Sequence, residues 1–356
     1  MTAPKFNNGG EDTSVTPETT RVHGFTLPPE GRIYRPTYSR GQYVLPPLEG
    51  GAANTKLTRA TTVAHALDDQ AGLDKWKTRQ VVRGMVDLYR EDADSLEETL
   101  SQVDLFGEPR DLNRDLDAVV QSAQDRAGSS YGSELGTTIH AWTEAVERDG
   151  LAVEDVPNQF RPYVQAYMDR LADAGISTEP GMVERIVVND EYGAAGTFDR
   201  LYRLPDGSLA IGDVKTSKMS SLNYSWLGWS TQMALYAGAA RMLTLDGAGY
   251  EDMPVVRQDY AVVAHLPSDN PGHCELITVD LQAGRQALET AMDVRFLRQN
   301  AGKVIPRQWT LPSHETTLED LVAQCSTQDE LAELWDANQD QWTDELTQLG
   351  LSRLHP

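Results

Sequence analysis

The sequence contains little cysteine, few basic residues and no long apolar run. Only two of its 356 residues are cysteines, Cys274 and Cys325. Two thiols are too few for a disulfide framework, a four-cysteine zinc site or an iron–sulfur cluster. No apolar stretch approaches the roughly 18 residues that a membrane span needs, and residues 1–8 carry no apolar signal region. We therefore expect a cytoplasmic protein without membrane contact.

The shortage of basic residues bears on the partners of the protein. Lys and Arg number 31 against 54 Asp and Glu, and the net charge is −23. Such a balance argues against nucleic acid, because phosphates are bound mainly by cationic side chains. The acidic residues are concentrated, however, in Glu91–Glu98 and Glu315–Glu345, and a bound divalent metal adds local positive charge. We therefore allow a basic track on an acidic body, with binding that weakens at high salt.

Composition divides the chain into three parts. Residues 1–55 are rich in Pro, Gly, Thr and Asn and predict an extended or loosely packed arm. Residues 56–305 carry the periodic apolar patterns of a folded domain. Residues 306–356 are polar and acidic, with apolar side chains at helical spacing, such as Leu331 and Leu334, and predict a helical appendage.

The patterns of the middle part predict an α/β fold. Leu135, Ile139 and Trp142 belong to one helical stripe, and later segments change to the short apolar runs of strands separated by turns. The expected strands are 182–188, 195–204, 208–214, 255–266 and 275–279, and the expected later helices are 230–243 and 281–299. This order predicts a mixed sheet flanked by helices.

Asp199, Asp213 and Lys215 are the strongest candidates for chemistry. The two carboxylates are expected at the ends of adjacent strands that run in opposite directions. Asp213 and Lys215 share one strand face at i, i+2. Carboxylate oxygens suit Mg²⁺, a bound metal can acidify water and neutralise charge on a phosphate, and a lysine can stabilise that charge. The group indicates phosphodiester hydrolysis, although Asp-x-Lys alone is common by chance.

His140 follows two glycines at a spacing of four, Gly132 and Gly136, on the same helix face. Glycines allow a backbone or a ligand to approach closely, and imidazole is a good ligand beside carboxylates. The alternative is a hydrogen-bonded core histidine. The acidic strands downstream favour a metal ligand.

Further candidates are weaker. Gln232 and Tyr236 face the same way on a predicted helix and could hold a nucleotide by hydrogen bonding and stacking, although a tyrosine taken alone, like Tyr236, is more often a packing residue. Glu184 is either a further acidic contact or a solvated strand residue. Thr216 and Ser217 either bind phosphate or form a turn.

In chain order the motifs are Gly-x-x-x-His, Gly-Thr-x-Asp, Asp-x-Lys and Gln-x-x-x-Tyr, between residues 132 and 236. This order resembles the PD-(D/E)xK nuclease superfamily, and within it the RecB-like exonucleases of phages. The resemblance implies a restriction-endonuclease-like fold in the domain 56–305 and metal-dependent DNA hydrolysis with Mg²⁺ or Mn²⁺. It further implies DNA recombination, replication or repair, a possible partner protein of these processes, and a host cytoplasm for a phage-encoded protein.

The resemblance also assigns roles. His140, Asp199, Asp213 and the carbonyl of Val214 would bind the metal, and Lys215 would position or activate water. The Gln-x-x-x-Tyr pair would contact the DNA strand. The four cysteines of the iron–sulfur relatives are missing, so we expect no cluster. Two alternatives stay open: a catalytically silent nuclease fold that binds DNA or a protein partner, and an endonuclease of the same superfamily.

Overall fold

The computed structural model describes residues 21–22, 25–29, 36–48, 53–304 and 316–354. The chain divides into a large unit, Met1–Gln299, and a small unit, Asn300–Pro356. The boundary expected at residue 306, like the first 20 residues of the expected N-terminal arm, lies outside the described residues. None of the helices in these ranges is both long and apolar enough to cross a membrane.

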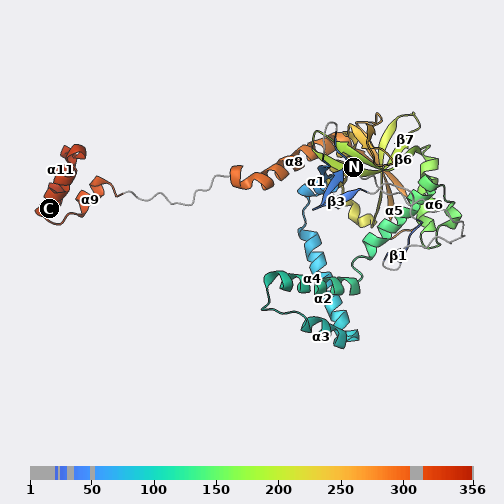
Figure 1. Ribbon diagram of the computed structural model, residues 1–356, viewed down its shortest axis with the longest axis horizontal. Helices are drawn as coiled ribbons and strands as arrows, with labels where there is room; N and C mark the ends of the chain where they lie inside the picture. Colours follow the sequence, from blue (N-terminus) through green and yellow to red (C-terminus); the bar gives the residue numbers. More distant parts are fainter. Residues whose placement is uncertain (1–20, 23–24, 30–35, 49–52, 305–315, 355–356) are drawn as a thin grey trace. The chain divides into compact units, whose positions relative to one another are not determined.

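A mixed sheet, ten-stranded over the described residues, forms the centre of the large unit (Figure 1). Its strands are β3 (Thr37–Ser39), β4 (Gln42–Leu45), β5 (Thr55–Arg59), β6 (Ser177–Asn189), β7 (Ala194–Arg203), β8 (Leu209–Ser217), β9 (Arg241–Leu243), β10 (Tyr250–Asp252), β11 (Tyr260–Pro267) and β12 (Glu275–Asp280). β6, β7 and β8 are consecutive antiparallel neighbours, and β11 lies parallel to β8. The expected α/β fold with a mixed sheet is confirmed.

The sheet is forked along one edge of β7. At the start of β7, Ala194 and Ala195 pair with β5, whereas at its end the run from Arg200 to Arg203 pairs with β8. Gly196–Asp199 lies between these two pairings. The turn before β8 is stabilised by Asp206, which accepts hydrogen bonds from the N–H and hydroxyl of Ser208. β8 therefore starts in register with β7 and leaves it at the fork.

Helices cover both faces of the sheet. On one face α5 (Tyr131–Asp149) and α6 (Arg161–Asp173) pack through Ile139 and Tyr167 onto Tyr202 and Val262. The other face packs against α1 (Ala60–Ala64), α7 (Trp226–Ala237) and α8 (Leu281–Val304) in a second core. Successive residues of β7 supply the two cores, Leu201 to one and Tyr202 to the other, as the alternation of a strand requires.

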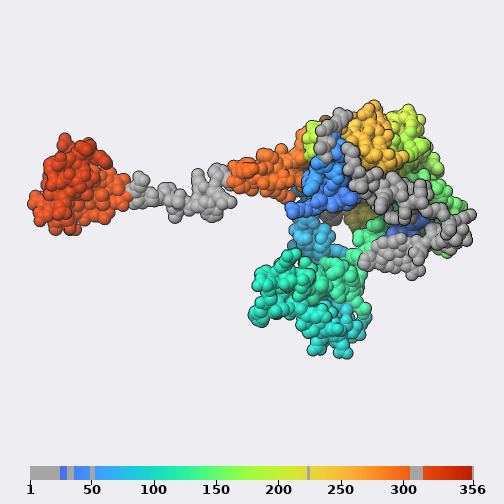
Figure 2. Space-filling view, in the orientation of Figure 1, coloured from blue at the N-terminus to red at the C-terminus, as the bar shows by residue number. Residues whose placement is uncertain are grey.

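A group of three helices, α2 (Ala71–Glu91), α3 (Ala93–Ser101) and α4 (Pro109–Arg126), connects α1 to α5. α2 follows the short 3₁₀ helix η1 (His65–Leu67). In Figure 2 α4 (teal) lies across α2 (light blue). Gly84 permits this crossing, because an added Cβ there would lie 1.7 Å from the carbonyl oxygen of Ala123.

The remaining elements are short. β1 (Arg21–Val22) and β2 (Phe25–Thr26) form a two-stranded pair, and β2 is fixed to α5 by a hydrogen bond from the indole of Trp142 to the carbonyl of Thr26, 3.0 Å long. 3₁₀ helices lie at η2 (Val153–Asp155), η3 (Met219–Tyr224) and η4 (Gln339–Gln341). The small unit contains α9 (Leu318–Gln324), α10 (Gln328–Ala337) and α11 (Asp344–Leu354) around its own apolar cluster.

The helix expected at 230–243 was predicted too long at its C-terminal end. α7 ends at Ala237, and Arg241–Leu243 is strand β9, which pairs with β6. The last carbonyls of α7 find partners outside the helix: Asn189 donates to the carbonyl of Leu235 and Gln258 to that of Ala237. These bonds satisfy groups that a helix end leaves unpaired, and they come from residues distant in sequence.

We expect substitution of Gly196 by alanine to destabilise the protein by about 1–3 kcal/mol, because overpacking forces neighbours to shift. An added Cβ would lie 2.4 Å from Cε1 of Tyr236 and 2.8 Å from Cβ of Ala60. Gly132→Ala is the matched control, because an added Cβ there meets no atom within 4 Å. Urea denaturation of both variants measures the effect, and equal midpoints would contradict the close packing of α7 on β7.

Candidate metal centre

The fork in the sheet brings together the strand residues that the motifs single out. β8 pairs with β7 as far as Gly212, opposite Arg200, and Asp213 and Lys215 come directly after this point. Asp199 spans the fork, because its Oδ2 accepts a hydrogen bond of 2.8 Å from the backbone N–H of Val214. The two carboxylates and the amine therefore lie together where the two strands separate, but inside β7 and β8 and not at the strand ends that the sequence predicted.

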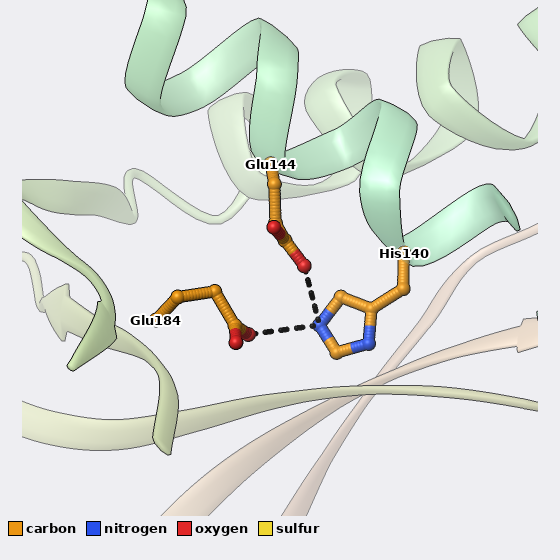
Figure 3. Close-up of side chains that lie close together, drawn as sticks. All are labelled: His140, Glu144 and Glu184. Carbon is orange, nitrogen blue, oxygen red and sulfur yellow. Dashed lines mark ion pairs between the residues drawn. The ribbon is translucent and has the colours of Figure 1, made fainter. Parts of the chain in front are cut away.

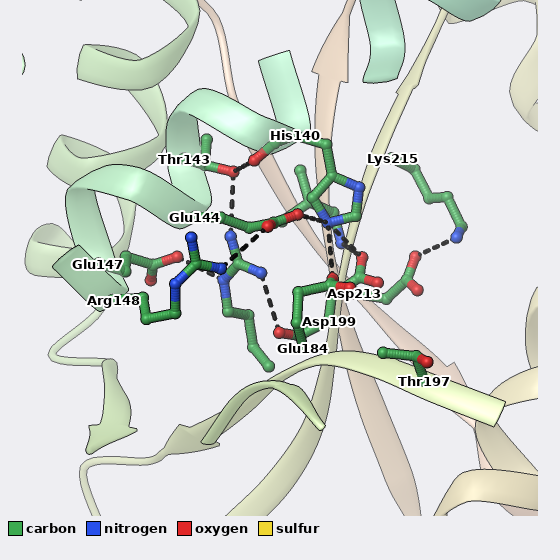
Figure 4. A network of polar contacts seen from close by, with 12 residues as sticks. His140, Thr143, Glu144, Glu147, Arg148, Glu184, Thr197, Asp199, Asp213 and Lys215 are labelled. Carbon is green, nitrogen blue, oxygen red and sulfur yellow. Dashed lines mark hydrogen bonds and ion pairs between the residues drawn. The ribbon is translucent and has the colours of Figure 1, made fainter. Parts of the chain in front are cut away.

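His140 reaches the same place from α5 (Figure 4). Its Nε2 lies 3.1 Å from Oδ2 of Asp199. Burial opposes a charge on the imidazole, but Asp199 and Glu184 outweigh it and raise the pKa of His140 to about 9. For Asp199, burial is likewise outweighed by His140 and Lys215, which hold its pKa below the ordinary value. The imidazole of His140 and the carboxylate of Asp199 therefore form a buried ion pair.

Two glutamates extend the acidic group around His140. Its Nε2 lies 3.6 Å from Oε1 of Glu184 and 3.7 Å from Oε1 of Glu144 (Figure 3). One ligand atom from each of the three side chains falls within 4.8 Å of the others, a spacing that could hold a metal ion. Of the two roles that the sequence allowed for Glu184, an acidic contact or a solvated strand residue, the structure therefore favours the acidic contact. Glu144 was missed in the sequence, although its position four residues after His140 on one helix was a signal.

The backbone of Glu184 is strained. Its φ is +55°, a left-handed conformation that is uncommon for a residue with a Cβ. Glu184 follows an irregularity in the pairing of β6 with β7, between Thr178 and Val183. Irregular pairing of this kind redirects a side chain, and strained residues persist where the surrounding structure fixes them. Burial, followed by repulsion from Glu144 and Asp199, raises the pKa of Glu184.

Asp213 is the most unusual group of the centre. It is fully buried, and among the described residues neither carboxylate oxygen has a hydrogen-bond partner of normal geometry. Its ion pair is with the ammonium of Lys215, with Nζ 2.5 Å from Oδ2. Burial and the nearby charge of Asp199 raise the pKa of Asp213. A buried carboxylate without hydrogen bonds is costly, and a divalent cation bound by its oxygens would offset that cost.

The predicted nucleotide contacts have different surroundings. Gln232 and Tyr236 do face the same way on α7, but the amide of Gln232 donates to the hydroxyl of Tyr236 over 2.7 Å. Tyr236 is only 2% exposed and its ring packs against Gly196. Its ring is therefore not open to stacking, which agrees with the packing alternative. Contact of Gln232 with DNA stays a prediction.

Thr216 and Ser217 are the last residues of β8, not a turn. The Cβ of Thr216 faces Gly136 of α5, where an added Cβ would lie 3.5 Å away, so this glycine lets helix and strand approach. The hydroxyl of Ser217 lies 3.0 Å from Nε2 of buried His265. The predicted binding of phosphate by these two hydroxyl groups stays untested.

A buried polar network lies behind the centre and was not anticipated from the sequence. Arg200, with no exposed surface, forms an ion pair with Glu147 of α5. Its guanidinium also donates to the carbonyl of Asp199 (2.9 Å) and to the hydroxyl of Thr143 (3.0 Å), which in turn donates to the carbonyl of His140 (2.7 Å). Arg200 is therefore bonded, directly or through one hydroxyl, to the backbone of two candidate ligands. A lone arginine in a strand gives no sequence signal for this role.

Comparison of the sequence with protein-family models finds no matching family, and a search of curated proteins finds no matching sequence. The chemistry of the centre is therefore the basis on which a function can be inferred.

Proposed function

We propose that the protein is a metal-dependent deoxyribonuclease of the PD-(D/E)xK type, with a restriction-endonuclease-like core and RecB-like exonuclease activity on DNA. The observation that carries the proposal is the buried Asp213 carboxylate, which has no hydrogen bond of normal geometry within the described part of the chain, beside Asp199 and His140 at the fork of the sheet. The same proposal includes a role in DNA recombination, replication or repair and a partner protein from those processes. It also includes a phage origin, with the protein located in the host cytoplasm.

The donor set fits Mg²⁺ or Mn²⁺. These ions prefer carboxylate oxygens, and Mn²⁺ also accepts imidazole. Asp199, Asp213, His140 and the carbonyl of Val214 would hold the ion, and His140 is shared with the group that it forms with Glu144 and Glu184. A metal bound there supplies Lewis acidity, which activates water and neutralises charge on the scissile phosphate.

The side chains of the centre perform the remaining work. Lys215, on the same strand as Asp213, presents its ammonium at the centre, where it can orient a water molecule and stabilise the charge that develops on phosphorus-bound oxygens. The N–H of Val214 fixes the carboxylate of Asp199. Burial of Asp213 limits competing water. Each of these contributions is present before a substrate binds.

We expect Lys215→Met to reduce hydrolysis of DNA by about 10²–10³-fold, the usual cost of removing one stabilising donor, without weakening Mn²⁺ binding. Lys218→Met is the matched control, because this lysine is exposed and lies three residues further on. The assay is digestion of end-labelled linear and closed circular DNA with Mg²⁺ or EDTA, together with Mn²⁺ titration.

The substrates also separate the alternative functions. Degradation of linear DNA alone supports an exonuclease, whereas cleavage of closed circles would make the protein an endonuclease. Wild-type protein that binds DNA but hydrolyses neither form with Mg²⁺ or Mn²⁺ would leave a silent nuclease fold. Full activity of Lys215→Met would contradict the role given to this lysine.

A further inference from the structure

One face of α2 is basic in a chain of net charge −23. α2 contains five cationic residues and three acidic ones. At 3.6 residues per turn, four of the cations fall within a sector of about 80° and none of the acids does. The four are Lys75, Arg79, Arg83 and Arg90. Gly84, where α2 meets α4, lies outside this sector. We call these four residues and the surface between them the basic face of α2.

The cationic side chains of this face are accessible to a binding partner. All four side chains are exposed. The structure records one ion pair for them among the described residues, between Arg83 and Asp87 at 3.8 Å. From Lys75 to Arg90 the helix rises about 22 Å, comparable to the length of duplex axis occupied by six or seven phosphates of one strand, at roughly 3.4 Å of axis each. The charge and its linear extent fit a phosphate backbone.

A second group of cations lines a hollow beside the segment that leads into α2. A hollow of about 400 Å³ between α1, η1 and α8 is lined by Arg295 and Arg298, with His65 beside them. Arg295 has one long hydrogen bond, 3.5 Å to the hydroxyl of Thr58. Among the residues that line the hollow, Ala66 lies five positions before the start of α2. The connection between Ala66 and Lys75 contains three acidic residues, Asp68, Asp69 and Asp74, and no cation.

The same segment is connected to the metal centre. Ala60, the first residue of α1, contacts β7 at Gly196, three residues before Asp199. α1 also packs on α7, which carries Gln232 and Tyr236. The chain thus runs from the fork of the sheet through α1 and η1 into α2. A DNA strand held at the fork could extend along this path.

We propose that the basic face of α2 is a DNA-binding surface that engages the phosphate backbone of the substrate outside the metal centre, without regard to sequence. The inference deepens the proposed nuclease function by naming where the body of the substrate is held. DNA is favoured over an acidic protein or an anionic membrane because the cations form a row of the required length on the helix that follows α1 and η1, and α1 packs beside the candidate centre. It also explains how an acidic chain binds a polyanion.

The test compares two variants of equal charge change. Arg79→Ala/Arg83→Ala removes two cations from the basic face, and Lys77→Ala/Arg110→Ala removes two exposed cations of the same helical group outside it. Binding of a labelled DNA duplex of about 20 base pairs is measured by fluorescence anisotropy in EDTA over a salt series, with full-length protein. Circular dichroism verifies that both variants are folded.

Loss of two phosphate contacts should lower the slope of log K against log salt by about 1.8. We expect this change in the face variant and a slope within about 0.5 of wild type in the control. Equal slopes in the two variants would overturn the proposal, as would binding of the face to phosphatidylserine vesicles but not to DNA. Binding and hydrolysis are scored separately, so a protein that binds DNA through this face but cuts nothing refutes the nuclease function alone.

Discussion

Replacement of Asp213 by asparagine is expected to reduce metal-dependent hydrolysis of linear DNA by at least about 10³-fold, more than the loss of a single stabilising donor. The substitution keeps the size of the side chain but removes the charge that a hard cation requires. Asp213 has no exposed surface and no second carboxylate can move into its place from β8. Mn²⁺ affinity should fall together with activity.

The same substitution should not destabilise the metal-free protein. An ionised carboxylate that is buried without hydrogen bonds costs free energy, and the ion pair with Lys215 offsets only part of that cost. The thermal midpoint of Asp213→Asn in EDTA is therefore expected to equal or exceed that of wild type. Loss of activity with retained or higher stability identifies a functional carboxylate, because a structural one would lower both.

Asp206→Asn serves as the control for this experiment. Asp206 lies in the turn before β8, and its side chain is more than half exposed. Hydrolysis and Mn²⁺ binding should remain at the wild-type level in this variant. If Asp213→Asn instead cleaved DNA like wild type, or bound Mn²⁺ equally well, the assignment of the centre would be wrong.

The parts of the fold that sequence could predict depend on local signals. The turn at Asp206 and Gly207 and the apolar runs beside it place β7 and β8 as neighbours, and the bonds from Ser208 to Asp206 stabilise that turn. Once the hairpin is recognised, the meeting of Asp199 with Asp213 follows. The apolar stripe that includes Ile139 likewise predicts α5, and so the position of His140.

The parts that sequence could not predict depend on contacts between distant segments. The fork requires β5 to pair with β7 across more than 130 residues, and no local pattern specifies that. The end of α7 is determined by side chains from Asn189 and Gln258. Glu184 reaches the centre because the pairing of β6 is irregular just before it and its backbone is left-handed. The regular alternation of side chains along a strand does not predict that orientation. The position of this candidate ligand thus depends on a departure from ideal strand geometry.

Arg200 shows how the centre is held in place. Its guanidinium bonds to the carbonyl of Asp199 and, through Thr143, to the carbonyl of His140. Glu147, which neutralises Arg200, also accepts a hydrogen bond of 2.9 Å from Tyr167. Helix α5 and strand β7 are thus joined by a buried charge pair at the point where each contributes a candidate ligand. The relative position of those ligands depends on this pair.

Arg200→Met is accordingly expected to cost about 3–5 kcal/mol of unfolding free energy, because removal of one partner leaves the Glu147 carboxylate buried and uncompensated. Urea denaturation measures the loss. The double variant Arg200→Met/Glu147→Met should recover most of it, because apolar side chains of similar size can replace a buried ion pair. Arg203→Met is the control: its pair with Glu179 is partly exposed, so the expected cost is below about 1 kcal/mol.

The double variant also distinguishes two roles of Arg200, positioning of the candidate metal ligands and stabilisation of the fold. If Arg200 only stabilised the fold, the recovered protein would bind Mn²⁺ as wild type does. If it positions the ligands, Mn²⁺ affinity should remain about 10–100-fold weaker, the usual cost of losing a group that orients metal ligands. Isothermal titration of Mn²⁺ into the folded double variant distinguishes the two. Wild-type affinity would show that the fork alone holds Asp199 and His140, without the charge pair behind it.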